Sequence, residues 1–188
     1  MRHEAVLLIS LGERFDAARA ADLAARLGAG LSGVTFRAYA AVDEPLCYLY
    51  AHGPEAALPE VRARAAEQLA GARVRVLHAT IDRPGASAGQ DAPWHYIVET
   101  DVLPQAEADF NAWYDEEHLP GLAAVPGTVR ARRYECLHEP PRYLACYDLR
   151  TRETFGSPPW LAVRATDWSS RVRPSFRNTR RTMFARIL

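Results

Sequence analysis

Residues that could carry chemistry gather in the segment 106–127, where an acid, an imidazole and an amide accompany an aromatic stripe. The aromatic residues recur at the i, i+3 and i+4 spacing of one helix face: Phe110, Trp113 and Tyr114. At about 100° per residue, Glu117 projects near the centre of this stripe, and His118 and Asn111 lie along its flank. The pattern predicts a small-molecule site at the end of a helix.

His118 is the leading candidate for proton transfer. A neutral imidazole with a pKa of about 6.5 can accept and return a proton near neutral pH, which suits enolisation, cyclisation or isomerisation. Pro120 disfavours helical geometry at Leu119, so we expect the helix to end at His118. Alternatively, His118 only interacts with the helix dipole and bonds free carbonyl groups. Glu117 would orient the imidazole or, alternatively, belong to a solvated acidic run.

A second polar group lies on the predicted strand 128–136. Side chains alternate along a strand, so Arg132 and Tyr134 project to one side and Arg133 to the other. Inside a barrel, an arginine fork and a tyrosine hydroxyl could hold a carboxylate or an enolate. Alternatively, the arginines form an outer cluster paired with helix acids such as Asp115. Both arrangements are consistent with the alternation.

The elements that would position these residues follow one order twice. Apolar runs and helix signals in the first half predict strand, helix, strand, strand, helix, strand at 5–11, 16–27, 34–42, 46–51, 58–69 and 73–81. The second half predicts a strand, the helix already described, a hairpin, an irregular helical region and a last strand at 94–103, 106–118, 128–149, 152–167 and 180–188. This β-α-β-β-α-β order is that of a ferredoxin-like unit.

Landmarks shared by the two halves indicate an internal duplication. Gly33 matches Gly127 and Pro45 roughly matches Pro141, at a spacing of about 95 residues. Residues 84–93 have the Pro-, Gly- and Ser-containing composition of a linker. We therefore expect an α+β chain with a first ferredoxin-like repeat at 1–83, a linker at 84–93 and a motif-bearing second repeat at 94–188, packed sheet on sheet.

The second half resembles the dimeric α/β barrel superfamily, particularly its EthD-like and uncharacterised branches. The resemblance is carried by Phe110-x-x-Trp113-Tyr114-x-x-Glu117-His118-Leu119-Pro120, by Val125-Pro126-Gly127 and by Ala131-Arg132-Arg133-Tyr134. It implies a barrel of two ferredoxin-like units, usually from two chains and here from one. The first half lacks the motif, which implies one site per chain.

The resemblance implies several activities, since the superfamily includes cofactor-free monooxygenases, polyketide cyclases, lactone isomerases and haem-degrading enzymes. We expect a cofactor-independent enzyme for a small aromatic or polyketide-like metabolite, with His118 and Tyr134 as catalytic residues. Four residues would bind the substrate: Asn111, Trp113, Glu117 and Arg132. The alternative is a non-catalytic ligand-binding or assembly protein in which these aromatics form core. Haem binding is a lesser alternative.

Composition excludes several other classes. The chain of 188 residues has 23 basic residues, all arginine, and 23 acidic ones, so its net charge gives no reason to expect nucleic acid. No apolar run is long enough for a membrane span, and no secretory signal is visible, so we expect a cytoplasmic protein. Three cysteines without metal-type spacing indicate reduced thiols and no metal site. An intrachain barrel is compatible with a further homodimer.

Overall fold

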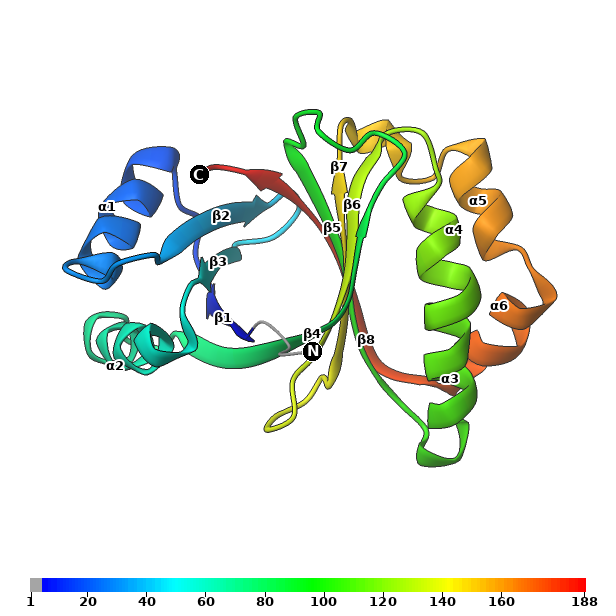
Figure 1. Ribbon diagram of the computed structural model, residues 1–188, viewed down its shortest axis with the longest axis horizontal. Coiled ribbons are helices and arrows are strands. Elements are labelled where there is room, and N and C mark those ends of the chain that lie inside the picture. The colour runs from blue at the N-terminus through cyan, green and yellow to red at the C-terminus, as the bar shows by residue number, and fades with distance from the viewer. Residues whose placement is uncertain (1–4) are drawn as a thin grey trace.

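The computed structural model describes residues 5–188 and shows an eight-stranded barrel flanked by helices on two sides (Figure 1). The strands are β1 (Ala5–Leu11), β2 (Thr35–Ala41), β3 (Cys47–His52), β4 (Arg73–Pro84), β5 (Trp94–Val102), β6 (Thr128–Glu135), β7 (Tyr143–Leu149) and β8 (Phe176–Arg186). Around the barrel they follow the order β1-β3-β2-β8-β5-β7-β6-β4, with antiparallel pairing throughout. The predicted α+β class is confirmed.

Two seams join the strands of the first half to those of the second. At one seam β2 pairs with the end of β8, and at the other β4 pairs with β6. The strand predicted to end at residue 81 continues to Pro84, because its last residues pair with the start of β6. Since β4 also pairs with β1, the ring is closed and every described strand has two neighbours.

The helices lie outside the barrel in two layers on opposite sides (Figure 1). One layer holds α1 (Ala17–Gly28) and α2 (Leu58–Gln68), preceded by the short η1 (Glu55–Ala57). The other holds α3 (Glu107–Trp113), η3 (Tyr114–His118), α4 (Leu119–Ala123), α5 (Pro158–Arg164) and α6 (Asp167–Val172), with the short turns η2 (Pro104–Ala106), η4 (Arg152–Thr154) and η5 (Arg173–Ser175). Among residues 5–188, no helix is long and apolar enough to cross a membrane.

Apolar clusters fill the barrel and the space beneath each helical layer. The barrel interior includes Leu8, Tyr48, Leu144 and Phe184. The layer of α1 and α2 buries Leu23, Leu27 and Val61, and the layer of α3 to α6 buries Phe110, Trp113 and Trp160. Complete burial of each leucine, valine or phenylalanine among these side chains contributes roughly 1.5–3 kcal/mol. The second helical layer is the more aromatic of the two, as the segment 106–127 predicts.

The helix that begins at α3 does not end at His118, contrary to the sequence prediction. Residues Tyr114–His118 form a π-turn in which the Leu119 N–H donates to the Tyr114 carbonyl five residues earlier, and α4 follows directly. The extra residue places Pro120 in the first turn of α4, where a fixed φ and a missing N–H are tolerated. The predicted helix stop is therefore wrong, because a wider turn absorbs the proline.

Candidate functional site

The predicted site residues divide between the two faces of one sheet. Arg132 and Tyr134 on β6 face the barrel interior, whereas Arg133 faces the helices. The remaining predicted residues lie in the outer helical layer: Asn111, Trp113, Glu117 and His118. The structure therefore does not bring His118 together with Arg132 and Tyr134, because the sheet lies between them.

In the helical layer, His118 packs against aromatic rings. Its imidazole stacks on the Trp113 indole, with ring centroids 4.0 Å apart and an interplanar angle of 21°, and meets the Tyr114 ring edge-on. Along a regular α-helix, His118 would lie about 140° around the axis from Trp113, at about 100° per residue. The π-turn instead brings it onto the same face, and π-turns are frequent at functional sites.

A small cavity of about 30 Å³ adjoins His118, with room for roughly one or two water molecules. We call it the helix-side pocket. Its walls are aromatic and apolar: Tyr96, Val98, Trp113, Tyr114, His118, Leu122, Tyr147, Trp160 and Phe176. Arginines complete the lining: Arg164, Arg173 and Arg181. Within residues 5–188, none of these arginines has a carboxylate within 4.0 Å.

Three buried polar groups of this pocket lack hydrogen-bond partners in the described part of the chain. They are the His118 Nδ1, the Tyr147 hydroxyl and the Trp160 Nε1. Buried polar groups in proteins are nearly always hydrogen-bonded, and leaving one unpaired costs about 1–3 kcal/mol. Three such groups beside one cavity make it a candidate place for a bound molecule or ordered water.

The electrostatics of the pocket favour a negative ligand. Burial and then the nearby Arg164 and Arg173 lower the pKa of His118 to about 3, so the imidazole is neutral at physiological pH. Burial and the like charges of Arg164 and Arg181 also lower the pKa of Arg173. The arginines are therefore close enough to repel one another, and an anion between them would relieve that repulsion.

Glu117 and Asn111 are already engaged by neighbouring side chains. The Glu117 carboxylate accepts hydrogen bonds from the Trp113 indole at 3.2 Å and from the Thr166 hydroxyl at 2.6 Å. The Asn111 side-chain carbonyl accepts a 2.5 Å hydrogen bond from Arg133. The Asn111–Arg133 contact joins the helical layer to β6, whereas both partners of Glu117 lie within the helical layer. Glu117 therefore orients Trp113 rather than His118.

Inside the barrel, a separate hydrogen-bonded group surrounds Asp148. Its carboxylate accepts from Arg132 Nη2 at 2.7 Å and contacts His95 Nδ1 at 2.6 Å. Burial alone would raise the pKa of Asp148, but Arg132 and the His95 hydrogen bond hold it below its usual range. Burial lowers the pKa of His95, against the effect of Asp148. A neutral His95 therefore donates from Nδ1 and accepts the Tyr50 hydroxyl at Nε2, 3.2 Å away.

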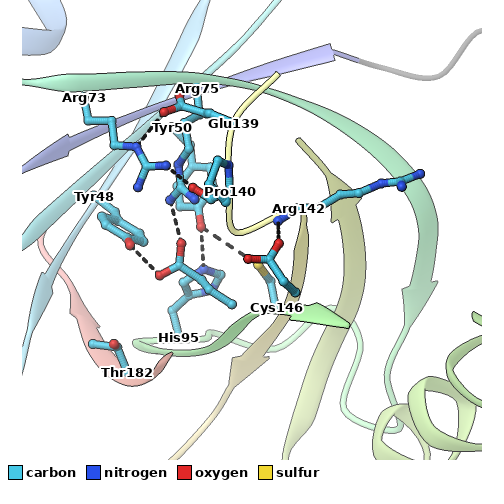
Figure 2. Close-up of polar contacts among 12 residues, drawn as sticks. Tyr48, Tyr50, Arg73, Arg75, His95, Glu139, Pro140, Arg142, Cys146 and Thr182 are labelled. Atoms are coloured by element: carbon cyan, nitrogen blue, oxygen red, sulfur yellow. Dashed lines mark hydrogen bonds and ion pairs between the residues drawn. The ribbon is translucent and has the colours of Figure 1, made fainter. Parts of the chain in front are cut away.

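From His95 the contacts continue to Tyr50, whose hydroxyl lies between His95 and Cys146 (Figure 2). Burial raises the pKa of the Cys146 thiol to about 12, so it is not a nucleophile in this state. A second buried group joins Arg75 to Glu99 at 2.6 Å, and the Tyr48 hydroxyl donates to the same carboxylate at 2.6 Å. All three cysteines are buried and free.

Several residues of both groups are not apparent from the sequence. Arg164, Arg173 and Arg181 line the helix-side pocket, although no sequence pattern singles them out. No sequence pattern gives His95 or Asp148 a role. The available signal was strongest at Asp148, the only charged residue in the otherwise largely apolar β7, whereas β5 holds other polar residues besides His95.

The pocket as it stands does not fit a metal centre or haem. Among residues 5–188, no cluster of His, Cys, Asp or Glu could hold a metal ion. Haem ligation needs a histidine directed into a large cavity. The Trp113 indole covers one face of the His118 ring at 4.0 Å, and Trp113 and Trp160 are fully buried in the core, so no such cavity lies beside His118.

Comparison with known proteins gives no sequence family, but it does give a fold. No protein-family model matches the chain, and no curated protein is detectably similar in sequence. A "putative monooxygenase" from Fusobacterium nucleatum subsp. nucleatum is 12% identical, with a TM-score of 0.70 over 100% of this chain and 94% of that chain. An "anthrone oxidase-like protein" is 14% identical, with a TM-score of 0.67 over 100% of this chain and 92% of that one. A "putative chlorite dismutase" is 10% identical, with a TM-score of 0.65 over 100% and 96%.

These likenesses, together with the closed antiparallel barrel, define the class of fold. The chain has the architecture of the dimeric α/β barrel proteins, with all eight barrel strands supplied by one polypeptide. Identities of 10–14% carry no argument about substrate or reaction. Function must therefore be argued from the helix-side pocket and the barrel interior.

Proposed function

We propose that the chain binds a small aromatic molecule that carries or develops negative charge on an oxygen atom, in the helix-side pocket. One observation carries the proposal. Counting residues 5–188, three buried polar groups without a hydrogen-bond partner and three arginines without a nearby carboxylate line one cavity with aromatic walls. Aromatic walls favour a planar ring, and the arginines favour an oxygen anion.

We further propose a cofactor-independent enzyme that forms an enolate from this molecule. Removal of a proton beside a carbonyl group places negative charge on the carbonyl oxygen, which prearranged cations and hydrogen-bond donors stabilise. Arg164 and Arg173 would supply the positive charge, and the hydroxyl of Tyr147 would donate a hydrogen bond. The enolate could then isomerise, cyclise or react with dioxygen.

His118 is the proposed proton acceptor. With a pKa of about 3 it is a weak base in the free protein, because burial and the arginines disfavour its charged form. An enolate forming beside the arginines offsets their charge, so the imidazole becomes a better acceptor as the reaction proceeds. The proposed site does not include Arg132 or Tyr134, because both face the barrel interior. It also does not include Glu117, whose carboxylate is bonded to Trp113 and Thr166.

Ligand entry requires the pocket to widen, because 30 Å³ is far below the roughly 300–1,000 Å³ of ordinary ligand sites. The movable part is its arginine lining. Arg181 is exposed and Arg164 and Arg173 are half-buried, whereas Trp113 and Trp160 are packed in the core. We expect a ligand to displace the arginine side chains and leave the aromatic walls in place.

Binding is tested by titrating 1-naphthoate while following tryptophan fluorescence, because Trp113 and Trp160 line the pocket. The neutral analogue 1-naphthamide serves as the ligand control. Arg181→Gln should weaken naphthoate binding about tenfold, or about 1.4 kcal/mol. Arg177→Gln removes an exposed charge from the same strand outside the pocket and should leave binding unchanged. Equal affinity for the acid and the amide would contradict the proposed site.

Turnover is tested with anthrone and dioxygen, a choice suggested by the anthrone oxidase-like fold neighbour. Conversion of the anthrone CH₂ to a carbonyl consumes one O₂ and releases one water, so an oxygen electrode and the quinone spectrum should agree. His118→Phe preserves the stack on Trp113 but removes the proton acceptor. If this variant oxidised anthrone at the parent rate, the role assigned to His118 would be wrong.

A second candidate is a non-catalytic ligand-binding protein, and the low pKa of His118 favours it. Naphthoate binding without turnover of anthrone or related ketones would support this candidate. We also infer that residues 1–83 and 94–188 are tandem ferredoxin-like units joined by 84–93, since the strand pairing within each half follows that order. Membership of the EthD-like branch remains a proposal that rests on the 110–120 motif.

A further inference from the structure

A second group of cavities lies at one mouth of the barrel, away from the helix-side pocket. The outer cavity has a volume of about 570 Å³ and the inner one about 110 Å³, and both are lined by Arg37, Asp82 and Arg130. Asp148 belongs to the outer cavity and Arg132 to the inner one. We call the two together the barrel-mouth cavity.

The barrel-mouth cavity carries an excess of positive charge. Arg130 is paired with Asp82, and Arg132 with Asp148. Arg37 has no carboxylate within 4.0 Å in the part of the chain that the structure describes. In the outer cavity Arg186 is paired with Asp91. Four arginines against three aspartates therefore leave one positive charge, that of Arg37.

Arg132 has hydrogen-bonding capacity that the protein does not use. Its side chain is only 7% exposed, and its buried Nε has no partner among residues 5–188. The Asp148 carboxylate holds the guanidinium through Nη2, and His95 holds Asp148 from the other side. Figure 2 shows the same His95 in contact with the Tyr50 hydroxyl. Arg132 is therefore fixed by a chain of contacts that runs through Asp148 and His95 to Tyr50. A preorganised guanidinium loses little freedom when it binds a ligand.

The pKa of His52, which also lines the inner cavity, reflects the positive charge around it. Burial, followed by Arg132, Arg37 and Arg130, lowers its pKa to about 4. Three arginines therefore act together on one point in the cavity. A negative ligand placed there would offset them.

We propose that the barrel-mouth cavity is a second binding site, which takes a small polar monocarboxylate through Arg132 and Arg37. A single excess charge matches a monoanion rather than a phosphate dianion. A planar carboxylate suits the guanidinium fork. The 110 Å³ inner cavity admits only a few heavy atoms, and the Thr35 hydroxyl and the Asp82 carboxylate offer partners for a ligand hydroxyl. A short hydroxy acid has this chemistry.

The test uses lactate as the probe and lactamide, its neutral amide, as the control, in NMR titrations at low salt. Lactate should shift the resonances of His52 and Thr35 and raise the pKa of His52, whereas lactamide should not. Arg37→Gln should weaken lactate binding at least tenfold, and Arg37 is exposed, so the variant should fold. Arg62→Gln, an exposed arginine on α2, is the matched charge control and should bind lactate like the parent.

The two proposed sites are separable in the same experiment. His118→Phe should leave lactate binding unchanged, and Arg37→Gln should leave naphthoate binding unchanged. No lactate binding, equal shifts with lactamide, or a parent-like affinity in Arg37→Gln would each overturn the barrel-mouth proposal. None of these outcomes would bear on the helix-side pocket.

Discussion

Replacement of His118 by phenylalanine should make the protein less sensitive to acid. The folded protein binds a proton at His118 only near pH 3, whereas the unfolded chain binds one below about pH 6.5. Protons therefore favour the unfolded state as the pH falls through 6.5, and stability is greatest above that value. The phenylalanine ring keeps the stack on Trp113 and has no group to protonate.

The size of the effect follows from this difference in pKa. For each histidine that stays neutral in the folded protein, the free energy of unfolding falls by about 1.4 kcal/mol per pH unit below 6.5. Acidification to pH 5 therefore lowers it by roughly 2 kcal/mol through His118. His52, with a pKa of about 4, adds a similar amount, and the lowered pKa of His95 acts in the same direction. Ordinary carboxylates still contribute little at pH 5, since their unfolded pKa values are about 4.

Urea unfolding at pH 7.5 and pH 5.0 measures the effect directly. The free energy of unfolding of the parent should fall by at least about 4 kcal/mol between pH 7.5 and pH 5.0, and that of His118→Phe should fall by about 2 kcal/mol less. His138→Asn, at an exposed loop position, should show the parental loss. The comparison uses the difference between the two pH values, so a change in baseline stability cancels. If His118→Phe lost as much as the parent, the environment assigned to His118 would be wrong.

Two further substitutions test the barrel and its connections. Gly127→Ala should destabilise the protein by about 1–3 kcal/mol in thermal unfolding, because φ is +96° and the new Cβ would lie 2.2 Å from the Thr154 Oγ1. Gly89→Ala is the control: its φ is +82° but the space around it is open, so the loss of stability should be smaller. Asp148→Asn should cost about 3–5 kcal/mol in urea unfolding because it leaves Arg132 buried without its counter-charge, and adding Arg132→Met should recover most of that loss. A double variant no more stable than Asp148→Asn alone would show that the pair contributes through something other than charge.

Local sequence signals predicted the strands and helices well where the period was regular. The first-half helix expected at 16–27 is observed at Ala17–Gly28, and the Asp16 side chain caps it by accepting from the Arg19 N–H at 2.8 Å. The second-half hairpin is also where alternation placed it, at β6 and β7. Such features depend on neighbouring residues, which the sequence displays directly.

The candidate site was harder to predict because it depends on backbone geometry and on distant pairings. An α-helical period cannot anticipate one π-turn, so it misplaced His118 relative to Trp113. The alternation of side chains along β6 predicts that Arg132 and Arg133 lie on opposite faces of the sheet. Which of them faces the barrel interior depends on how β6 pairs with β4 and β7, and these partners are distant in sequence. Arg173 reaches the pocket through the path of the last helices, which no local sequence pattern predicts.

Closure of the barrel by a single chain changes what one substitution can do. In a barrel made from two identical chains, each change appears twice and both halves must tolerate it. Here each residue appears once per barrel, so one helical layer can become aromatic and arginine-lined while the other keeps an aliphatic core. The strand pairs that join the halves, β2 with β8 and β4 with β6, hold the shape of the barrel whichever side is changed. The two sides of the barrel are encoded by different residues of one chain, so a binding site can be altered on one side without a matching change on the other.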